Sequence, residues 1–131
     1  MGHILVIDDD EAIREMLRRL LERNGYRVTT AEDGREGLLT FQQESFDVVI
    51  TDVLMPEMDG IEIIMQLLNQ DSNVRIIAIS GGGRIPSNEY LHLAGELGAL
   101  RQFVKPVNKD VLLGAVRELC GSSLETTIPG G

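Results

Sequence analysis

Each of four apolar, strand-like runs in this chain is followed by a side chain that could do chemistry. These side chains belong to Asp8 and Asp9 after residues 4–7, Asp52 after residues 48–51, Ser80 after residues 76–79, and Lys105 after residues 103–104. In an open parallel sheet, ligands bind just beyond the carboxyl ends of the strands. We therefore expect three carboxylates, a hydroxyl and an amine to meet in one crevice, a set that suits a divalent cation together with a phosphoryl group.

The three aspartates would place about three negative charges in a small volume, where they repel one another unless a cation is bound. Mg²⁺ takes oxygen ligands and typically uses one or two carboxylates together with water and phosphate oxygens. Asp10 and Glu11 are explained as an acidic helix start, which the helix dipole favours. Asp8 and Asp9 exceed what a helix start requires, so the sequence predicts that they form a Mg²⁺ site with Asp52.

Asp52 is the candidate nucleophile, because a carboxylate that attacks phosphorus forms an aspartyl phosphate. Such a transfer requires little beyond alignment and neutralisation of the charge on the equatorial oxygens. Mg²⁺ would supply positive charge on one side and Lys105 on the other, while Ser80 could donate a hydrogen bond to a phosphoryl oxygen. Taken singly, a lysine at a strand end is most often a solvated charge, and Ser80 before three glycines is most often a loop residue. Their combination with the aspartates is what indicates a site.

The chain alternates strand-like and helical patterns five times, which is typical of an α/β fold with a doubly wound, five-stranded parallel sheet. The first helix is the clearest, since Ile13, Met16, Leu17, Leu20 and Leu21 repeat at helical spacing before Asn24-Gly25. An alternating edge strand is expected at residues 26–30. A second helix is expected after a cap at Asp33, and a third after a cap at Asp59, with Ile61, Ile64, Met65 and Leu68 on one face. A fourth, with Tyr90, Ala94 and Leu97, is expected to end at Gly98. The last is expected to end before Gly121 and carries Val111, Leu112, Ala115, Val116 and Leu119.

Length and composition indicate one globular domain at residues 3–121, and the polar residues 122–131 read as a flexible tail, a linker or non-native residues. Nothing resembles a secretory signal or a membrane span, so we expect a cytoplasmic protein without a membrane partner. The net charge of −9 without a basic run argues against direct nucleic-acid binding. The single cysteine, Cys120, excludes an internal disulfide, and its spacing from Val116 indicates packing.

Four separated motifs resemble, in order and spacing, those of the receiver domain of two-component response regulators. They are residues 4–9, Asp52 with Met55-Pro56 and Met58-Asp59-Gly60, Ile79-Ser80, and Lys105-Pro106, so that the resemblance covers roughly residues 3–121. It implies a flavodoxin-like (βα)5 fold with strand order 2-1-3-4-5. It also implies the following roles: Asp52 as phosphoacceptor, Asp8 and Asp9 as the acidic pair for Mg²⁺, the carbonyl of Leu54 as a further metal ligand, Ser80 as the switch residue, and Lys105 as the lysine of the family.

The same resemblance implies partners and a mode of action. The phosphoryl group would come from a histidine kinase or a histidine phosphotransfer protein, and the signal would pass to a downstream effector protein or domain. A homodimer through the face of the fourth helix, fifth strand and fifth helix is a further expectation. The chain would be a signalling domain and not a free-standing enzyme, although it takes part in its own phosphoryl transfer and dephosphorylation. It departs from the family at Gln102, where an aromatic residue is usual; Phe103 or Tyr90 could substitute for that ring.

Three alternatives remain at this point. A flavodoxin-like electron carrier would share the sheet order, but it requires a hydroxyl- and glycine-rich phosphate loop where this chain has residues 8–11, all acidic. A haloacid-dehalogenase-type phosphatase requires a second aspartate two residues after the first, where Leu54 stands. The third alternative is a receiver-like module that serves only for protein contacts, which the intact set of five site residues argues against and only an assay separates.

Overall fold

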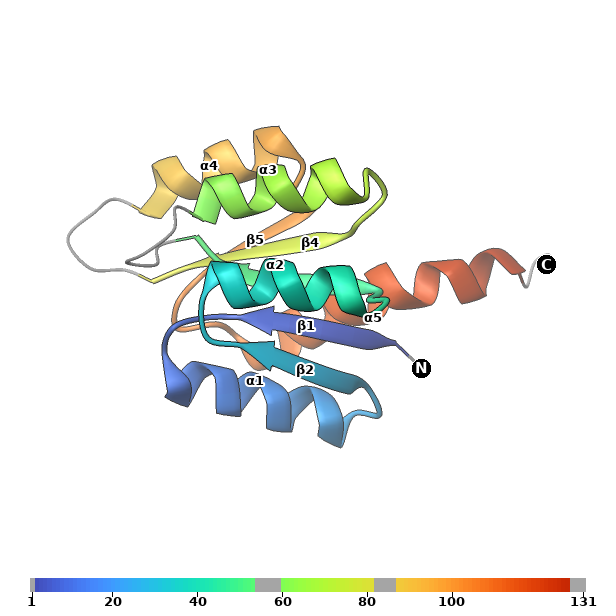
Figure 1. Ribbon diagram of the computed structural model, residues 1–131. Coiled ribbons are helices and arrows are strands. Elements are labelled where there is room, and N and C mark those ends of the chain that lie inside the picture. Colours follow the sequence, from blue (N-terminus) through green and yellow to red (C-terminus); the bar gives the residue numbers. More distant parts are fainter. Residues whose placement is uncertain (1, 54–59, 82–86, 128–131) are drawn as a thin grey trace.

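Five parallel strands form one sheet in the computed structural model, which describes residues 2–53, 60–81 and 87–127 (Figure 1). The strands are β1 (His3–Ile7), β2 (Arg27–Ala31), β3 (Val48–Asp52), β4 (Ile76–Ser80) and β5 (Arg101–Val104). The helices are α1 (Glu11–Arg23), α2 (Gly34–Gln43), α3 (Gly60–Gln70), α4 (Ser87–Leu97) and α5 (Lys109–Thr127). The sheet order is β2-β1-β3-β4-β5, so the predicted doubly wound α/β fold and its strand order are confirmed.

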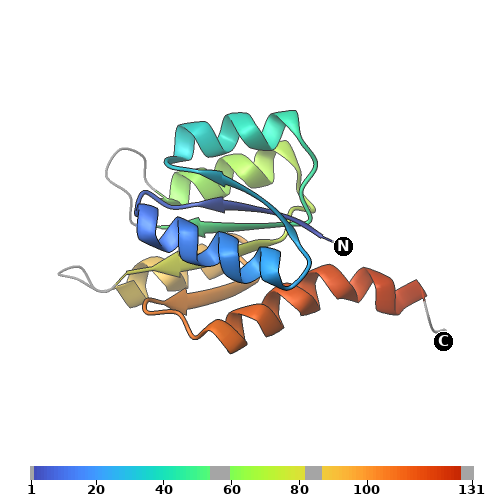
Figure 2. The same cartoon turned by 90° about the horizontal axis from the view of Figure 1, so that it is seen from below.

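Helices cover both faces of the sheet, with α1 and α5 on one face and α2, α3 and α4 on the other (Figures 1 and 2). Each face has its own apolar cluster, because successive side chains of a strand point to opposite sides. Strand β1, for example, contributes Leu5 and Ile7 to the cluster under α2–α4, and Ile4 and Val6 to the cluster under α1 and α5. Burial on both faces explains why the central strands are continuous apolar runs instead of alternating ones.

Three helix boundaries follow the sequence signals that predicted them. Asp10 caps α1, since its carboxylate accepts hydrogen bonds from the N–H groups of Ala12 and Ile13 at 2.9 and 3.3 Å. The helix ends at Asn24, and Gly25 follows with a φ of 93°, a conformation that glycine adopts without strain. Asp33 caps α2 as expected, by accepting a hydrogen bond from the Glu36 N–H at 2.8 Å. These local signals fix where each helix meets the sheet.

The buried face of α3 differs from the prediction. Ile61 and Ile64 are buried as expected, but Met65 is 54% exposed, and Ile63 and Leu67 are fully buried instead. Helix α3 lies between α2 and α4 and contacts both, so its apolar surface is a wide arc and not a single stripe facing the sheet. The predicted cap at Asp59 lies outside the described residues.

Helix α5 continues to Thr127 instead of ending before Gly121, and its last part extends beyond the sheet (Figure 1). One glycine inside a helix costs only about 1 kcal/mol, so Gly121 alone does not end it. Val111, which was expected on the buried face, is 54% exposed. The division into a domain at residues 3–121 and a tail at 122–131 stays a prediction. Within the described ranges, no helix combines the length and apolar character that a membrane span requires.

Cys120 is expected to react slowly with thiol reagents. Burial, reinforced by the negative charge of Asp47, raises the pKa of its thiol from 9.0 to about 11. At pH 8 this lowers the thiolate fraction roughly 100-fold, and the higher nucleophilicity of a more basic thiolate recovers roughly tenfold. Alkylation by iodoacetamide, followed by intact mass, should therefore be about tenfold slower in the folded protein than in urea. Equal rates in the two conditions would contradict the buried environment.

Candidate functional site

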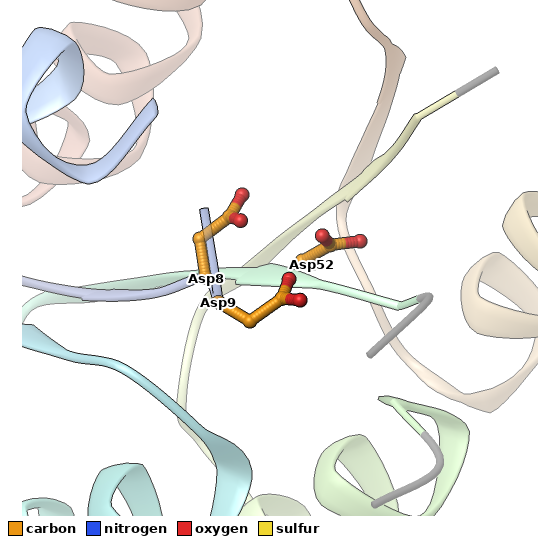
Figure 3. Close-up of side chains that lie close together, drawn as sticks. All are labelled: Asp8, Asp9 and Asp52. Atoms are coloured by element: carbon orange, nitrogen blue, oxygen red, sulfur yellow. The ribbon is translucent and has the colours of Figure 1, made fainter. Parts of the chain in front are cut away.

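The carboxyl ends of β1, β3, β4 and β5 meet at one edge of the sheet, as the sequence predicted. Strands β1 and β3 are neighbours, and their register pairs Ile7 with Thr51, so that Asp8 and Asp52 each follow this last pair. Carboxylate oxygens of Asp8, Asp9 and Asp52 all lie within 4.8 Å of one another (Figure 3). The structure therefore brings together the three carboxylates that the sequence singled out.

Asp8 is buried and its orientation is fixed by hydrogen bonds. It is 1% exposed, and its Oδ1 accepts a hydrogen bond from the Asp10 N–H at 2.9 Å. Its backbone N–H donates to the carbonyl of Ala31 at 3.2 Å, and its backbone carbonyl accepts from Arg14 Nη1 at 2.8 Å. These bonds leave Oδ2 as the oxygen that faces the other charged groups of the site.

The Lys105 ammonium lies between two carboxylates. Its Nζ is 2.9 Å from Asp8 Oδ2 and 3.1 Å from Asp52 Oδ2. Because β4 separates β3 from β5, the stem of the lysine must cross the end of β4, and its Cδ would lie 3.5 Å from a Cβ placed on Gly81. Burial disfavours the charged ammonium, but the contacts with Asp8 and Asp52 outweigh it and raise the pKa of Lys105. Lys105 is therefore a fixed cation of the site and not a solvated surface charge.

The carboxylates also fit a hard metal ion. Lys105 approaches Asp8 Oδ2 as an ion pair, yet this buried oxygen receives no directed hydrogen bond within the described residues. Asp52 is 4% exposed, whereas Asp9 is exposed and completes the cluster from the solvent side. A buried carboxylate oxygen without a directed donor is costly, and Mg²⁺ prefers such oxygen ligands. The carbonyl of Leu54, the further ligand expected from the sequence, lies outside the described residues.

Ser80 ends β4 at the same edge and is fully buried. Its hydroxyl donates a long hydrogen bond of 3.4 Å to the carbonyl of Gly81, and its own carbonyl accepts from the Lys105 N–H at 2.8 Å. The hydroxyl thus makes a weak bond that it can exchange for a stronger acceptor. The backbone bond ties the positions of Ser80 and Lys105 together.

Gln102 lies exposed on β5, and its Nε2 donates a hydrogen bond to the carbonyl of Ala99 at 2.8 Å. Phe103 packs against the cluster under α1 and α5, on the opposite face of the sheet from α4. Neighbouring residues of a strand point to opposite faces, so Phe103 does not replace a ring at residue 102. The side chain of Tyr90, the other expected substitute, lies outside the described residues.

Sequence reasoning missed two residues that shape the site. One is Arg14, whose spacing on α1 gives no sign that its guanidinium contacts Asp8. The other is Gly60, which the sequence marked as part of a motif but without a structural role. A Cβ on Gly60 would lie 2.2 Å from Val53 Cα and 2.7 Å from Val53 O, so α3 begins directly against the backbone that follows Asp52. Neither contact follows from residue type or periodicity, because both depend on how a helix docks on a strand end.

Comparison with known proteins gives consistent matches over nearly the whole chain. A family model described as the response regulator receiver domain matches residues 4–117. The sporulation initiation phosphotransferase F of Bacillus subtilis is 34% identical over 115 residues, which cover 88% of this chain and 90% of that protein. The solved structure of the response regulator TrrA of Thermotoga maritima, in complex with Mg²⁺-BeF, has a TM-score of 0.80 and 34% identity, and covers 91% of this chain and 99% of that one.

Other relatives are longer than this chain. The transcriptional regulatory protein GlrR of Escherichia coli is 34% identical over 126 residues, which cover 96% of this chain and 28% of that protein. The chain thus corresponds to one part of such a regulator.

Replacing Gly60 with alanine is expected to destabilise the fold by about 2 kcal/mol, because the new Cβ overlaps the Val53 backbone, which cannot move aside without shifting β3. Gly114 is the matched control, since it lies in α5 with open space around a Cβ. Gly114→Ala should stabilise the protein by about 0.5–1 kcal/mol through its higher helix propensity. Urea unfolding followed by circular dichroism measures both. Equal effects of the two substitutions would argue against the close contact at Gly60.

Replacing Lys105 with methionine is expected to tighten Mg²⁺ binding roughly tenfold, because an ammonium and a metal ion compete for the same oxygens. A tenfold change in affinity corresponds to about 1.4 kcal/mol, which is less than the few kcal/mol by which two unit charges interact at close range near a protein surface. Lys109→Met makes the same charge change at an exposed position of α5 and should leave the affinity nearly unchanged. Amide chemical-shift titration with MgCl₂ gives the dissociation constants. Weaker binding by Lys105→Met than by Lys109→Met would show that the two cations do not compete.

Proposed function

This chain belongs to the response regulator receiver domain family, the phosphoacceptor domains of two-component systems, and on that premise we propose that Asp52 is the residue that accepts the phosphoryl group. The observation that carries this proposal is the pair of contacts from Lys105 to Asp8 and Asp52, at 2.9 and 3.1 Å. They place a fixed cation beside a nucleophile and beside a metal-binding carboxylate at once. Family membership is incompatible with the flavodoxin-like and dehalogenase-type alternatives.

Asp52 suits the role of nucleophile better than its two neighbours. Asp8 is held by the Asp10 N–H through Oδ1 and is the more deeply buried of the two carboxylates beside Lys105. Asp9 is exposed and makes no ion pair with Lys105 in the described part of the chain. Asp52 ends the central strand β3 and lies close to both Asp8 and Asp9 (Figure 3), and its Oδ2 is 3.1 Å from the Lys105 ammonium.

The chemistry is a phosphoryl transfer between two nucleophiles. An oxygen of Asp52 forms the new P–O bond while the P–N bond of a phosphohistidine breaks, and the electron pair of that bond stays on the imidazole nitrogen. Lys105 then pairs with a phosphoryl oxygen, and the Ser80 hydroxyl donates to another in place of the Gly81 carbonyl. Asp8, Asp9 and Asp52 would hold Mg²⁺, which neutralises charge on the transferring group when bound.

A groove along α1 is the proposed docking site for the protein that donates the phosphoryl group. It has a volume of about 450 Å³, and it begins at Ala12, just after the capped turn that carries Asp8 and Asp9. The groove is lined by three apolar side chains, three basic side chains and one acidic side chain. They are Ala12, Met16 and Leu20, then Arg19, Arg23 and Lys109, and Glu15. In a chain with a net charge of −9, this basic surface fits a partner helix with an apolar ridge and acidic flanks.

The face made by α4, β5 and α5 is the proposed surface for output or homodimer formation. Four large apolar side chains are between 43% and 54% exposed on or next to these elements: Leu93, Leu100, Val104 and Val111. Val104 precedes Lys105 and pairs in register with Ser80, so this face adjoins the site directly. A shift of Lys105 and Ser80 towards a phosphoryl group would therefore reach the exposed patch within two residues.

Incubation with acetyl phosphate and Mg²⁺ is expected to add the mass of one phosphoryl group to the protein. The adduct should be absent in EDTA and in Asp52→Ala, because Asp8 is held by the Asp10 N–H and Asp9 makes no ion pair with Lys105 in the described part of the chain. Asp110→Asn, which changes an acid in the first turn of α5, serves as the control and should be phosphorylated normally. Intact mass and peptide mapping measure the adduct. An unchanged adduct in Asp52→Ala would refute the assignment, and no adduct in the wild type would favour a module that serves only for protein contacts.

A further inference from the structure

Arg14 contacts the end of β1 from the first helix. Its Nη1 donates a hydrogen bond of 2.8 Å to the backbone carbonyl of Asp8, six residues earlier in the chain. The side chain is partly buried and reaches back past the start of α1, the direction that long side chains on helices favour. Arg14 thereby touches the peptide group that joins Asp8 to Asp9.

This hydrogen bond completes a ring of contacts around Asp8. Asp10 caps α1 through its carboxylate, and its N–H donates to Asp8 Oδ1 at 2.9 Å. From the next turn of the helix, Arg14 donates a hydrogen bond to the backbone carbonyl of Asp8. The carboxylate and the backbone of Asp8 are both bonded to α1, so the helix sets the direction in which Asp8 Oδ2 points.

The Asp8 carbonyl lies beyond the end of the β1–β2 ladder. The last registered pair is Ile7 with Ala31, after which the chain following β2 turns towards the cap of α2 at Asp33. A backbone carbonyl at such a position requires a side chain or water as its donor. Arginine supplies a charge-assisted bond, which is stronger than a neutral one. Without it, the Asp8–Asp9 peptide could rotate, and both carboxylates of the acidic pair would move with it.

The charges along α1 leave Arg14 available for this contact. Glu15, its sequence neighbour, pairs with Arg18 and Arg19, and Arg18 also pairs with Glu22. Among the described residues Arg14 forms no ion pair, and the carbonyl of Asp8 is the acceptor of its guanidinium. Arg14 and Arg18 therefore share a helix and a charge but differ in what they hold.

We propose that Arg14 is a positioning residue for the Mg²⁺ and phosphoryl site. It fixes the Asp8–Asp9 peptide and so the aim of both carboxylates at the metal. The inference rests on the proposed function of Asp8 and Asp9, and it adds to that function a residue that touches neither the metal nor the phosphoryl group.

The test compares Arg14→Gln with Arg18→Gln in the full chain. Both remove one positive charge from α1, but only the first removes the bond to Asp8. The Mg²⁺ dissociation constant, from amide chemical-shift titration, should rise about tenfold in Arg14→Gln, as is usual when a residue behind a metal ligand is lost. It should stay within about twofold of wild type in Arg18→Gln, and Arg14→Lys, which keeps a donor and its charge, should recover part of the affinity. In Arg14→Gln at saturating Mg²⁺, the maximal rate of phosphorylation by acetyl phosphate should fall relative to wild type. This decrease should be a larger factor than the increase in the acetyl phosphate concentration that gives half the maximal rate.

Equal Mg²⁺ dissociation constants for Arg14→Gln and Arg18→Gln would overturn the positioning role, even if Arg14→Gln melts at a lower temperature. If the glutamine variant does not fold, Arg14→Met supplies the same comparison with a side chain of similar length. The proposed function fails in a different way, since the wild type would then show neither Mg²⁺ binding nor an adduct on Asp52. A wild type that does both, with an unaffected Arg14→Gln, would refute the role of Arg14 alone.

Discussion

The contact of one partly buried ammonium with two buried carboxylates is the interaction on which the rest of the site depends. Asp8 and Asp52 are 1% and 4% exposed and stand on adjacent strands, where two uncompensated negative charges would be costly. Lys105 offsets that cost from β5, two strands away from β3, by crossing the end of β4 beside Gly81. The strand order, the small residue at the end of β4 and the length of lysine are all required for this contact. The contact therefore depends on several elements together and not on any one of them.

The same contact makes the resting site a competition between cations. A metal ion bound at these carboxylates would compete for the oxygens that Lys105 contacts, and the proposed phosphoryl group on Asp52 would attract the ammonium. Because the Lys105 N–H is bonded to the Ser80 carbonyl, a displacement of the lysine is coupled mechanically to the end of β4. The exposed apolar residue Val104 lies on β5, directly before Lys105 in the chain and paired with Ser80 in the sheet. Binding at the carboxylates can in this way reach an interaction surface through few covalent and hydrogen bonds.

Much of the fold could be predicted because its signals are local or periodic. Apolar runs marked the strands, and Asp10, Asn24-Gly25 and Asp33 marked helix ends through capping interactions that involve only near neighbours. The meeting of Asp8, Asp9, Asp52, Ser80 and Lys105 at one edge could be predicted because parallel strands bring their carboxyl ends together there; the roles of these residues stay predictions. The buried face of α3 was not found, since Ile63 and Leu67 are covered by neighbouring helices that the sequence does not place. Arg14 and Gly60 were missed for the same reason, because their contacts arise only when a helix docks on a strand end.

The most direct test of this account is a crystal structure of the protein with Mg²⁺ and beryllofluoride, a mimic of a phosphoryl group on a carboxylate. We expect beryllium bonded to an oxygen of Asp52, Mg²⁺ held by Asp8, Asp9 and Asp52, and the Lys105 ammonium moved from Asp8 Oδ2 to a fluoride. The Ser80 hydroxyl should turn from the Gly81 carbonyl to another fluoride. Beryllofluoride bound to a different carboxylate, or a Lys105 that keeps both of its present contacts while the mimic is bound to Asp52, would contradict the central role of this ammonium.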